Sequence, residues 1–127
     1  MLFRSALLSL NSSLFYWFIT LLSDCRHLNK REVEAFPLIS GLMKPTTISA
    51  VCNVVSSLMK SLVAESEHRI MKFKHDTLTV QCIVPKKSWG IIQDVDAIVA
   101  ESLGLSADEA DYIANYDVKY RIGSGND

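Results

Sequence analysis

Apolar residues recur along most of the chain at intervals of three and four, the spacing of one face of an α-helix. The spacing predicts a helix over residues 2–10 and a second that begins at the capping residues Asn11, Ser12 and Ser13. The second helix carries an aromatic run and is apolar over a wide arc, so we expect it to be buried on more than one side. On that basis Trp17→Ala is expected to cost about 3–5 kcal/mol.

The clearest periodicity follows Pro45. Thr46 or Thr47 can cap a helix there, and its apolar stripe predicts that it runs to about Arg69. Asparagine, serine and lysine residues occupy the opposite face. We therefore expect a scaffold helix on which the aromatic helix packs.

Two helices are predicted near the C-terminal end of the sequence. Ser88 is placed to cap the first, and Gly104 to end it in the left-handed conformation. Ser106 and Glu109 form a capping box that begins the second. Asp94 and Asp96 are two residues apart and so do not share a helix face, which predicts a solvated position for both.

One stretch has a different pattern. Residues 73–84 include the β-rich run LTVQCIV, which predicts a short strand or an extended connector. A strand here needs a partner, for which residues 33–39 are the candidate, since Pro37 disfavours helical geometry at Phe36. The fold class expected is mainly α with a minor β component: four or five helices with at most one short two-stranded piece.

The 127 residues suffice for one small domain, which we expect to span residues 1–123. Its expected parts are an aromatic helix with a basic loop, a scaffold helix with an extended segment, a C-terminal helix pair and a flexible tail. These parts cover residues 1–45, 46–84, 85–123 and 124–127.

Composition and charge limit the kinds of partner. With 49% hydrophobic and 21% charged residues the chain is globular in composition, and its net charge of −1 provides no overall attraction to nucleic acid. A DNA contact would need a local patch.

Three widely spaced cysteines predict reduced thiols in the cytoplasm. Polar residues 11–13 interrupt the N-terminal apolar stretch, so a buried helix is expected there and no membrane partner.

A polar segment, residues 23–34, separates the aromatic helix from an apolar clamp at Val33, Phe36 and Pro37. Arginine suits bidentate contacts to guanine, and lysine suits phosphate. Taken alone, the residues favour a solvated loop over a DNA contact. The basic side chains of the segment, counting its one histidine, are Arg26, His27, Lys30 and Arg31.

Two stretches resemble a known family. LNSSLFYWF followed by SDCRHLNKREVEAFP, within residues 10–37, is similar to the late part of the target-recognition region of Eco57I-type N6-adenine DNA methyltransferases and fused restriction–modification enzymes. PKKSWGIIQDVDAIVAESLGLSADEADYIANYDVKYRIG, residues 85–123, resembles the C-terminal tail of the same family. The two stretches occur in the family's order and lie within residues 10–123.

The resemblance implies a fragment that binds double-stranded DNA and recognises its target. The family's Asn-Pro-Pro-Tyr loop and glycine-rich S-adenosylmethionine loop do not occur in this sequence. The chain alone is therefore not expected to be an enzyme or to hold a cofactor. Catalysis would belong to a separate methyltransferase chain or domain, and Met1 would lie partway through a longer protein. The residues expected at the DNA are Arg26, His27, Lys30, Arg31, Lys86 and Lys87.

An alternative function is a helical protein-interaction module that makes no DNA contact. The two differ in whether the cations share one surface or scatter around a larger apolar patch. Metal chemistry is not expected, because Cys25 with His27 supplies only two ligands and the spacing of seven from His68 to His75 and on to Cys82 matches no common zinc site.

Overall fold

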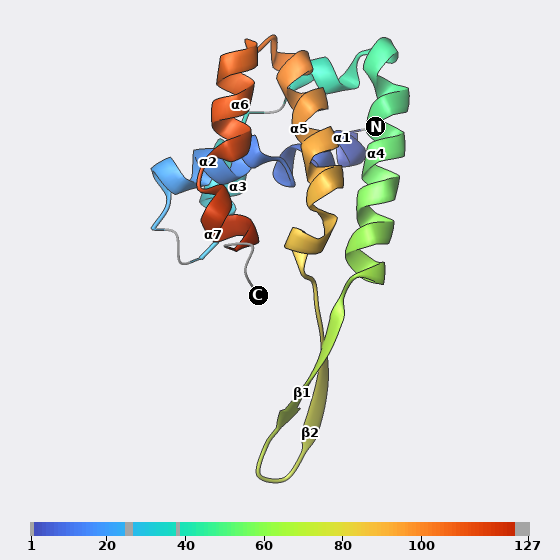
Figure 1. The fold of residues 1–127 in the computed structure, drawn as a ribbon, viewed down its shortest axis with the longest axis vertical. Helices are drawn as coiled ribbons and strands as arrows, with labels where there is room; N and C mark the ends of the chain where they lie inside the picture. Colours follow the sequence, from blue (N-terminus) through green and yellow to red (C-terminus); the bar gives the residue numbers. More distant parts are fainter. Residues whose placement is uncertain (1, 25–26, 38, 124–127) are drawn as a thin grey trace.

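The computed structural model describes residues 2–24, 27–37 and 39–123 of the chain, and these form a helical body with one projecting β-hairpin (Figure 1). The expected fold class, mainly α with one two-stranded piece, is confirmed. The described residues include more short helices than expected. In chain order the elements are α1 (Leu2–Leu10), α2 (Ser13–Leu22), α3 (Lys30–Ala35), the 3₁₀ helix η1 (Ser40–Met43), α4 (Pro45–Ala64), β1 (Glu67–Lys72), β2 (Thr77–Cys82), the 3₁₀ helix η2 (Pro85–Ser88), α5 (Trp89–Leu103), α6 (Ala107–Asn115) and α7 (Val118–Ile122).

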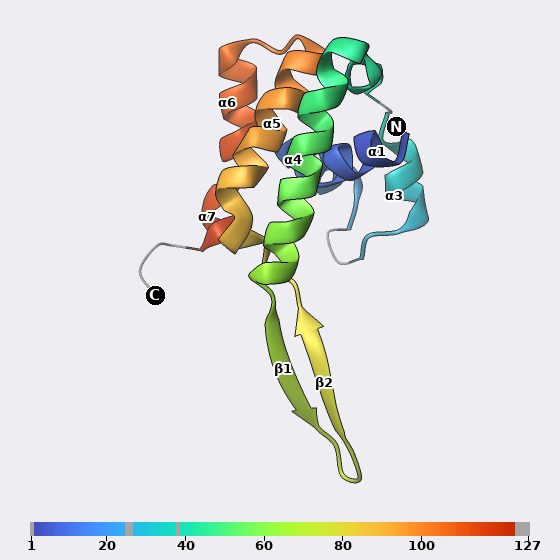
Figure 2. The ribbon, with the colours of Figure 1, turned by 90° about the vertical axis from the view of Figure 1, so that its right-hand side faces the viewer.

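The core lies where α4 and α5 run side by side and α1 and η1 pack on them (Figures 1 and 2). Apolar residues three and four apart on α4 and α5 face each other there, as the helical spacing predicts. Helix α6 packs on α2 and α5. The buried cluster consists of Leu8, Ile39, Leu42, Val51, Val55, Leu58, Ile92, Val95 and Val99.

Several predicted helix ends are confirmed. Ser12 caps α2, and its hydroxyl oxygen accepts a hydrogen bond from the backbone N–H of Phe15 at 3.2 Å. Gly104 ends α5 with φ of 68°. Ser106 and Glu109 form the capping box of α6, in which the Ser106 backbone N–H donates to Glu109 Oε2 at 2.8 Å. Local side-chain chemistry therefore set these boundaries.

The scaffold helix was predicted to run to Arg69, and this is wrong. Helix α4 begins at Pro45, which needs no amide hydrogen at that position, and it ends at Ala64. Beyond it, residues 67–72 alternate across a strand instead of continuing the helix. They do so because β2 pairs with them, a tertiary contact that overrides the local preference.

The strand partner predicted for residues 73–84 is also wrong. Residues 33–39 do not pair with them, because Val33 belongs to α3. Instead β1 and β2 form an antiparallel hairpin, with Glu67 opposite Cys82 and Lys72 opposite Thr77. The Phe73 N–H extends this register by donating to the carbonyl oxygen of Asp76 at 2.8 Å. We call residues 67–82 the arm, which projects from the ends of α4 and α5 (Figure 2).

The polar segment 23–34 was predicted to be a loop, but its second half is helix α3. The backbone N–H of Asn29 donates to Glu32 Oε2 at 3.1 Å, an interaction of the capping-box type. The predicted extended geometry at Phe36 is confirmed, with φ of −72° and ψ of 122°. Arg26 and the tail at residues 124–127 lie outside the described residues.

Among the described residues, α4 is long and apolar enough to cross a membrane, and so are α1 and α2 taken as one span bent by 67°. In this structure Val51, Val55 and Leu58 of α4 are buried in the core. The apolar face of α4 is therefore used in packing against α1 and α5.

Gly41 lies where η1 crosses the C-terminal end of α5. A Cβ at this position would meet the carbonyl oxygen of Ser102 at 2.4 Å. We expect Gly41→Ala to destabilise the fold by about 1–3 kcal/mol, because backbone atoms have to move apart. The matched control is Gly90→Ala in α5, where a Cβ meets nothing within 4 Å and alanine should stabilise by up to about 1 kcal/mol. Urea unfolding gives the free energy of unfolding of both variants. Equal changes in that free energy would contradict the close approach of Gly41 to Ser102.

Candidate nucleic-acid interface

Three of the predicted site residues lie together at α3. His27 precedes the helix and Lys30 and Arg31 form its first turn, all exposed. The Lys30 Nζ lies 3.4 Å from Glu34 Oε1, and Arg31 Nη2 lies 3.3 Å from Glu32 Oε1. Each cation therefore has a carboxylate beside it, and the local positive charge is largely compensated.

Glu32 is almost completely buried, at 3% exposure, beneath these cations. Hydrogen bonding from backbone N–H groups is the main cause that lowers the pKa of its carboxyl, and the Arg31 guanidinium also lowers it. The carboxylate is ionised at neutral pH as a result. One of its oxygens pairs with the Arg31 guanidinium, and the other accepts the backbone N–H of Asn29 in the cap of α3.

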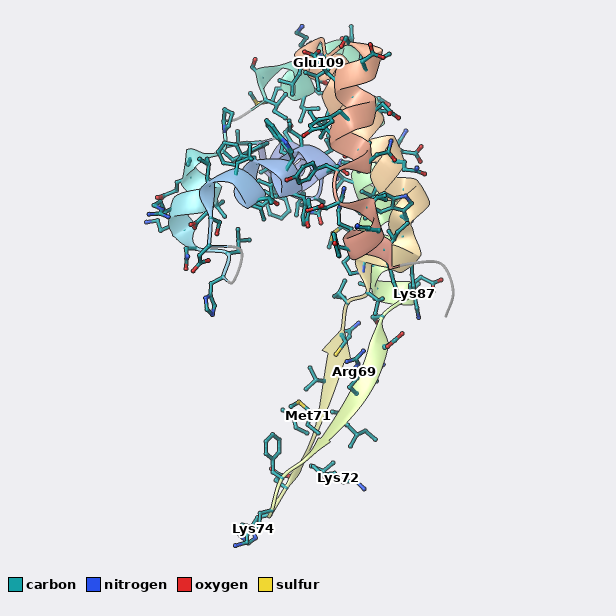
Figure 3. The ribbon with its side chains drawn as sticks, turned by 60° about the vertical axis from the view of Figure 1, so that its left-hand side comes forward. Arg69, Met71, Lys72, Lys74, Lys87 and Glu109 are labelled. Atoms are coloured by element: carbon teal, nitrogen blue, oxygen red, sulfur yellow. The ribbon has the colours of Figure 1, made fainter. Side chains whose placement is uncertain are left out.

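Lys86 and Lys87 lie elsewhere, on η2 at the base of the arm. Lys87 Nζ is 3.1 Å from Glu67 Oε1, and Arg69 Nη2 is 3.7 Å from Glu67 Oε2. Hydrogen bonding and charge from Lys87 lower the pKa of Glu67. One carboxylate thus faces two cations. Figure 3 shows Lys87 on the opposite side of the helical body from α3.

The predicted DNA contacts are therefore divided between two places. The α3 group contains His27, Lys30 and Arg31, while the arm-base group contains Lys86 and Lys87. Sequence reasoning treated the six residues as one set, but spacing along the chain does not reveal distance in space.

The arm carries further cations that sequence reasoning missed. Arg69, Lys72 and Lys74 are all exposed on it. Figure 3 shows Met71 and Lys72 on opposite sides of the ribbon and Lys74 at the tip. Residues 67–72, EHRIMK, do not alternate between polar and apolar side chains, so they carry no clear strand pattern, and the predicted helix extended into them to about Arg69.

One face of the arm carries a run of apolar side chains, flanked on the same face by the charged residues Arg69 and Asp76. Side chains alternate across a strand, so Met71, Leu78 and Val80 share a face by their register. Phe73 continues that face through its backbone pairing with Asp76. Met71, Phe73 and Leu78 are 50%, 58% and 52% exposed. We call these four residues the apolar row.

Charge is unevenly distributed along the chain. Residues 67–87, the arm and its base, contain five Lys or Arg and two Asp or Glu, a net charge of +3. The whole chain contains 13 and 14, so the remainder has eight and twelve, a net charge of −4. Two of the five cations, Lys86 and Lys87, lie at the base, so the arm itself carries three cations and two carboxylates, a net charge of +1. The arm and its base are thus positive and the rest of the chain is negative, which the overall charge of −1 conceals.

A second cluster joins α2, near the start of the chain, to α5 and α7, near its end. The Arg121 guanidinium lies between the rings of Tyr16 and Trp89, 4.7 Å from each centroid. Its Nη2 donates to Ser13 Oγ at 2.7 Å. The hydroxyl and the backbone N–H of Ser13 in turn donate to Asp96. We call these five residues the arginine cluster, which ties α2, α5 and α7 together.

The expected solvated position of Asp96 is wrong. Its carboxylate is partly buried against α2, and this desolvation raises its pKa, while Ser13 and then Arg121 act in the opposite direction. Desolvation also lowers the pKa of Arg121, and the charge of Asp96 opposes that change. The sequence contained the correct residues, but it did not show that Ser13 would reach Asp96 across 83 positions.

The raised pKa of Asp96 predicts a pH dependence. Because the folded state binds this proton more tightly than the unfolded state, the contribution of Asp96 to stability is fully present below its ordinary pKa of 3.8 and is lost as pH rises through the raised value. The free energy of unfolding of the wild type relative to Asp96→Asn should therefore fall over that window. Urea unfolding of both proteins from pH 3 upward measures this difference in the free energy of unfolding. The contributions of the other carboxylates are the same in both proteins and cancel. A flat difference would contradict the desolvated carboxylate.

Other chemistry finds little support in the described part of the chain. Within residues 2–24, 27–37 and 39–123, no three His, Cys, Asp or Glu side chains are grouped to hold a metal ion. His27 and Asp117 line a hollow of about 340 Å³ together with Tyr16, Ile19, Thr20, Ser23 and Leu28. Asp117 is the N-cap residue of α7 and has a left-handed backbone with φ of 53°. Its position is therefore explained by the turn between α6 and α7.

Comparison of the chain with models of known protein families, with curated proteins and with solved structures found no match.

Proposed function

We propose that the chain is a DNA-binding, target-recognition fragment of an adenine-N6 DNA methyltransferase or restriction–modification protein of Eco57I type. It works in the cytoplasm and binds duplex DNA. Transfer of the methyl group, with S-adenosylmethionine, belongs to a separate methyltransferase chain or domain.

The uneven charge is the observation that carries the proposal. A polyanion is attracted by a local positive surface even when the protein as a whole is slightly negative. The projecting residues 67–87 supply a net +3. Lys86 has no ion-pair partner among the described residues, and it lies beside Lys87 at the point where the arm leaves the body. The arm-base group is therefore the first contact proposed for the DNA backbone.

The arginine cluster supports the proposal indirectly. The two stretches similar to Eco57I-type enzymes are separated by more than forty residues, yet Ser13 and Tyr16 of one contact Arg121 of the other. If both stretches belong to one target-recognition unit, they are expected to pack against each other in the folded chain.

The test measures binding of the full chain to fluorescent duplex DNA over a range of salt concentrations. Lys86→Ala with Lys87→Ala should weaken binding and reduce the salt slope by about two, because each phosphate contact releases about one counterion. Lys30→Ala with Arg31→Ala should reduce the slope by less, since Glu34 and Glu32 already neutralise these cations.

The matched control is Lys44→Ala with Lys60→Ala, which removes the same charge at α4. It should leave the slope nearly unchanged. Equal losses in all three double variants would indicate a general charge effect and would contradict a located interface. No binding of the wild type at low salt would remove the proposal altogether.

A protein-interaction module remains a second candidate because of the exposed apolar residues away from the arm. Leu21, Leu22 and Leu28 are 59%, 56% and 61% exposed near α3. Replacing all three by serine should abolish association with a methyltransferase partner if this surface binds protein. Binding to the partner can be followed by analytical ultracentrifugation without DNA.

A further inference from the structure

The arm places an aromatic ring between two lysines at its far end. Phe73 is 58% exposed and follows Lys72, while Lys74 forms the tip (Figure 3). Among the described residues, neither lysine has an ion-pair partner. A two-stranded hairpin is only marginally stable in water, and exposed apolar side chains do not help it. A ligand that covers the apolar row and neutralises the lysines would stabilise the arm.

We infer that the arm enters the minor groove of duplex DNA and that Phe73 inserts as a wedge that partly unstacks a base step. Lys72 and Lys74 contact the phosphates on either side. The inference rests on the proposed function. It identifies the arm as the element that contacts the DNA and minor-groove insertion as its mode of binding.

Charge favours a polyanion over an apolar protein surface as the occupant. Three cations, Arg69, Lys72 and Lys74, lie along the arm, and Lys86 with Lys87 stands at its base. A second copy that paired arm to arm would bring the same positive charge against them, which repulsion disfavours. The negative body does not cover the arm, which projects away from it (Figures 1 and 2).

The side chains of the apolar row favour insertion between base pairs over recognition of bases by hydrogen bonds. Direct readout in the major groove needs hydrogen-bonding side chains. On the face of Met71, Leu78 and Val80 the neighbouring cation is Arg69, whose guanidinium lies 3.7 Å from Glu67. Phenylalanine, leucine and methionine are the side chains that minor-groove proteins insert between base steps, and the insertion kinks the duplex.

The length of the arm suits this mode. Six residues per strand at about 3.3 Å each give an arm of about 20 Å, while the minor groove is about 7.5 Å deep. The tip can therefore reach the floor of the groove with about 12 Å of the arm left outside, so the arm has to lie inclined along the groove for its base to stay near the outer phosphates. There Lys86 and Lys87 make the backbone contacts proposed above.

The experiment uses the full chain and a duplex of about three helical turns, labelled at both ends for energy transfer and carrying 2-aminopurine at successive steps. Wild type should shorten the distance between the ends and raise 2-aminopurine fluorescence where a step is unstacked. Phe73→Ala should abolish both signals and weaken binding about tenfold. Lys72→Ala with Lys74→Ala should reduce the salt slope by about two.

The matched control is Phe3→Ala, which removes a phenylalanine that is 74% exposed on α1 and should change none of these signals. If the wild type binds DNA and Lys86→Ala with Lys87→Ala weakens it, but the arm variants behave as wild type, the inference is overturned while the proposed function stands. A wild type that binds no DNA overturns both. Self-association of the chain that Phe73→Ala abolishes would identify the apolar row as a protein interface and would also overturn the inference.

Discussion

Arg121→Ala is expected to destabilise the folded chain by about 3 kcal/mol. The guanidinium lies 4.7 Å from the rings of Tyr16 and Trp89, and a partly desolvated cation between rings contributes about 2 kcal/mol. It also donates to Ser13 at 2.7 Å, and a charged hydrogen bond contributes about 1.5–3 kcal/mol. These contributions overlap. Loss of the cation further leaves Asp96 without the charge that offsets its burial.

Urea unfolding measured by circular dichroism gives the free energy of each variant. Arg121→Lys should recover only part of the loss, because an ammonium group keeps the charge but cannot stack as a planar guanidinium does. The matched control is Lys119→Ala on the same helix, whose Nζ lies 4.8 Å from the ring of Tyr120, a ring that is 73% exposed. That change should cost less than about 1 kcal/mol. Equal effects for Arg121→Ala and Lys119→Ala would show that the arginine cluster does not hold α7 in place.

Phe15→Ala is expected to cost about 3–5 kcal/mol, the usual loss for a phenylalanine removed from a core. Phe15 is 5% exposed, and its ring meets that of Phe36 edge to face at a centroid distance of 5.1 Å. Phe18 contacts Phe36 in the same way. Removing Phe15 therefore opens a cavity between α2 and the segment that follows α3.

The Trp17→Ala change, for which the same loss was predicted from the sequence, should cost clearly less. Trp17 is half-buried and lines an open hollow with Leu105 and Tyr112. Its neighbours already contact solvent, so less apolar surface is lost on truncation. Thermal and urea unfolding of the two variants compare the sites directly. A larger loss for Trp17→Ala than for Phe15→Ala would mean that the wide apolar arc of α2 is buried on the other side.

The candidate site could be predicted from the sequence only in part. Lys86 and Lys87 were identified as candidate phosphate contacts, and they lie exposed at the base of the arm. Lys72 and Lys74 were not, because the sequence predicted a helix to about Arg69 and no strand before residue 73, so the hairpin that carries them was not foreseen. Lys30 and Arg31 were identified, but the pairing of Lys30 with Glu34 appears only once residues 30–35 are helical and four positions become one turn. The pairing of Arg31 with Glu32 joins neighbours in the sequence.

Local chemistry alone determined much of the helical framework. Helix ends are set by local interactions, because a capping residue satisfies backbone groups of its own neighbours. The residues that do so are Ser12, Gly104 and the Ser106–Glu109 pair. The helical periodicity of α4 and α5 likewise required no knowledge of their partner. Fold class followed from these features.

Only the tertiary structure decided how distant segments meet. Residues 67–72 become a strand because β2 lies beside them, and Asp96 is partly buried because Ser13 and Arg121 reach it from opposite ends of the chain. The division of charge between arm and body also depends on where the hairpin points. The contacts of Ser13 with Asp96 and Arg121 join residues far apart in sequence, so no local pattern carries them. The β1–β2 pairing is closer along the chain, and there the energy of pairing decides between alternatives that local preference leaves nearly equal.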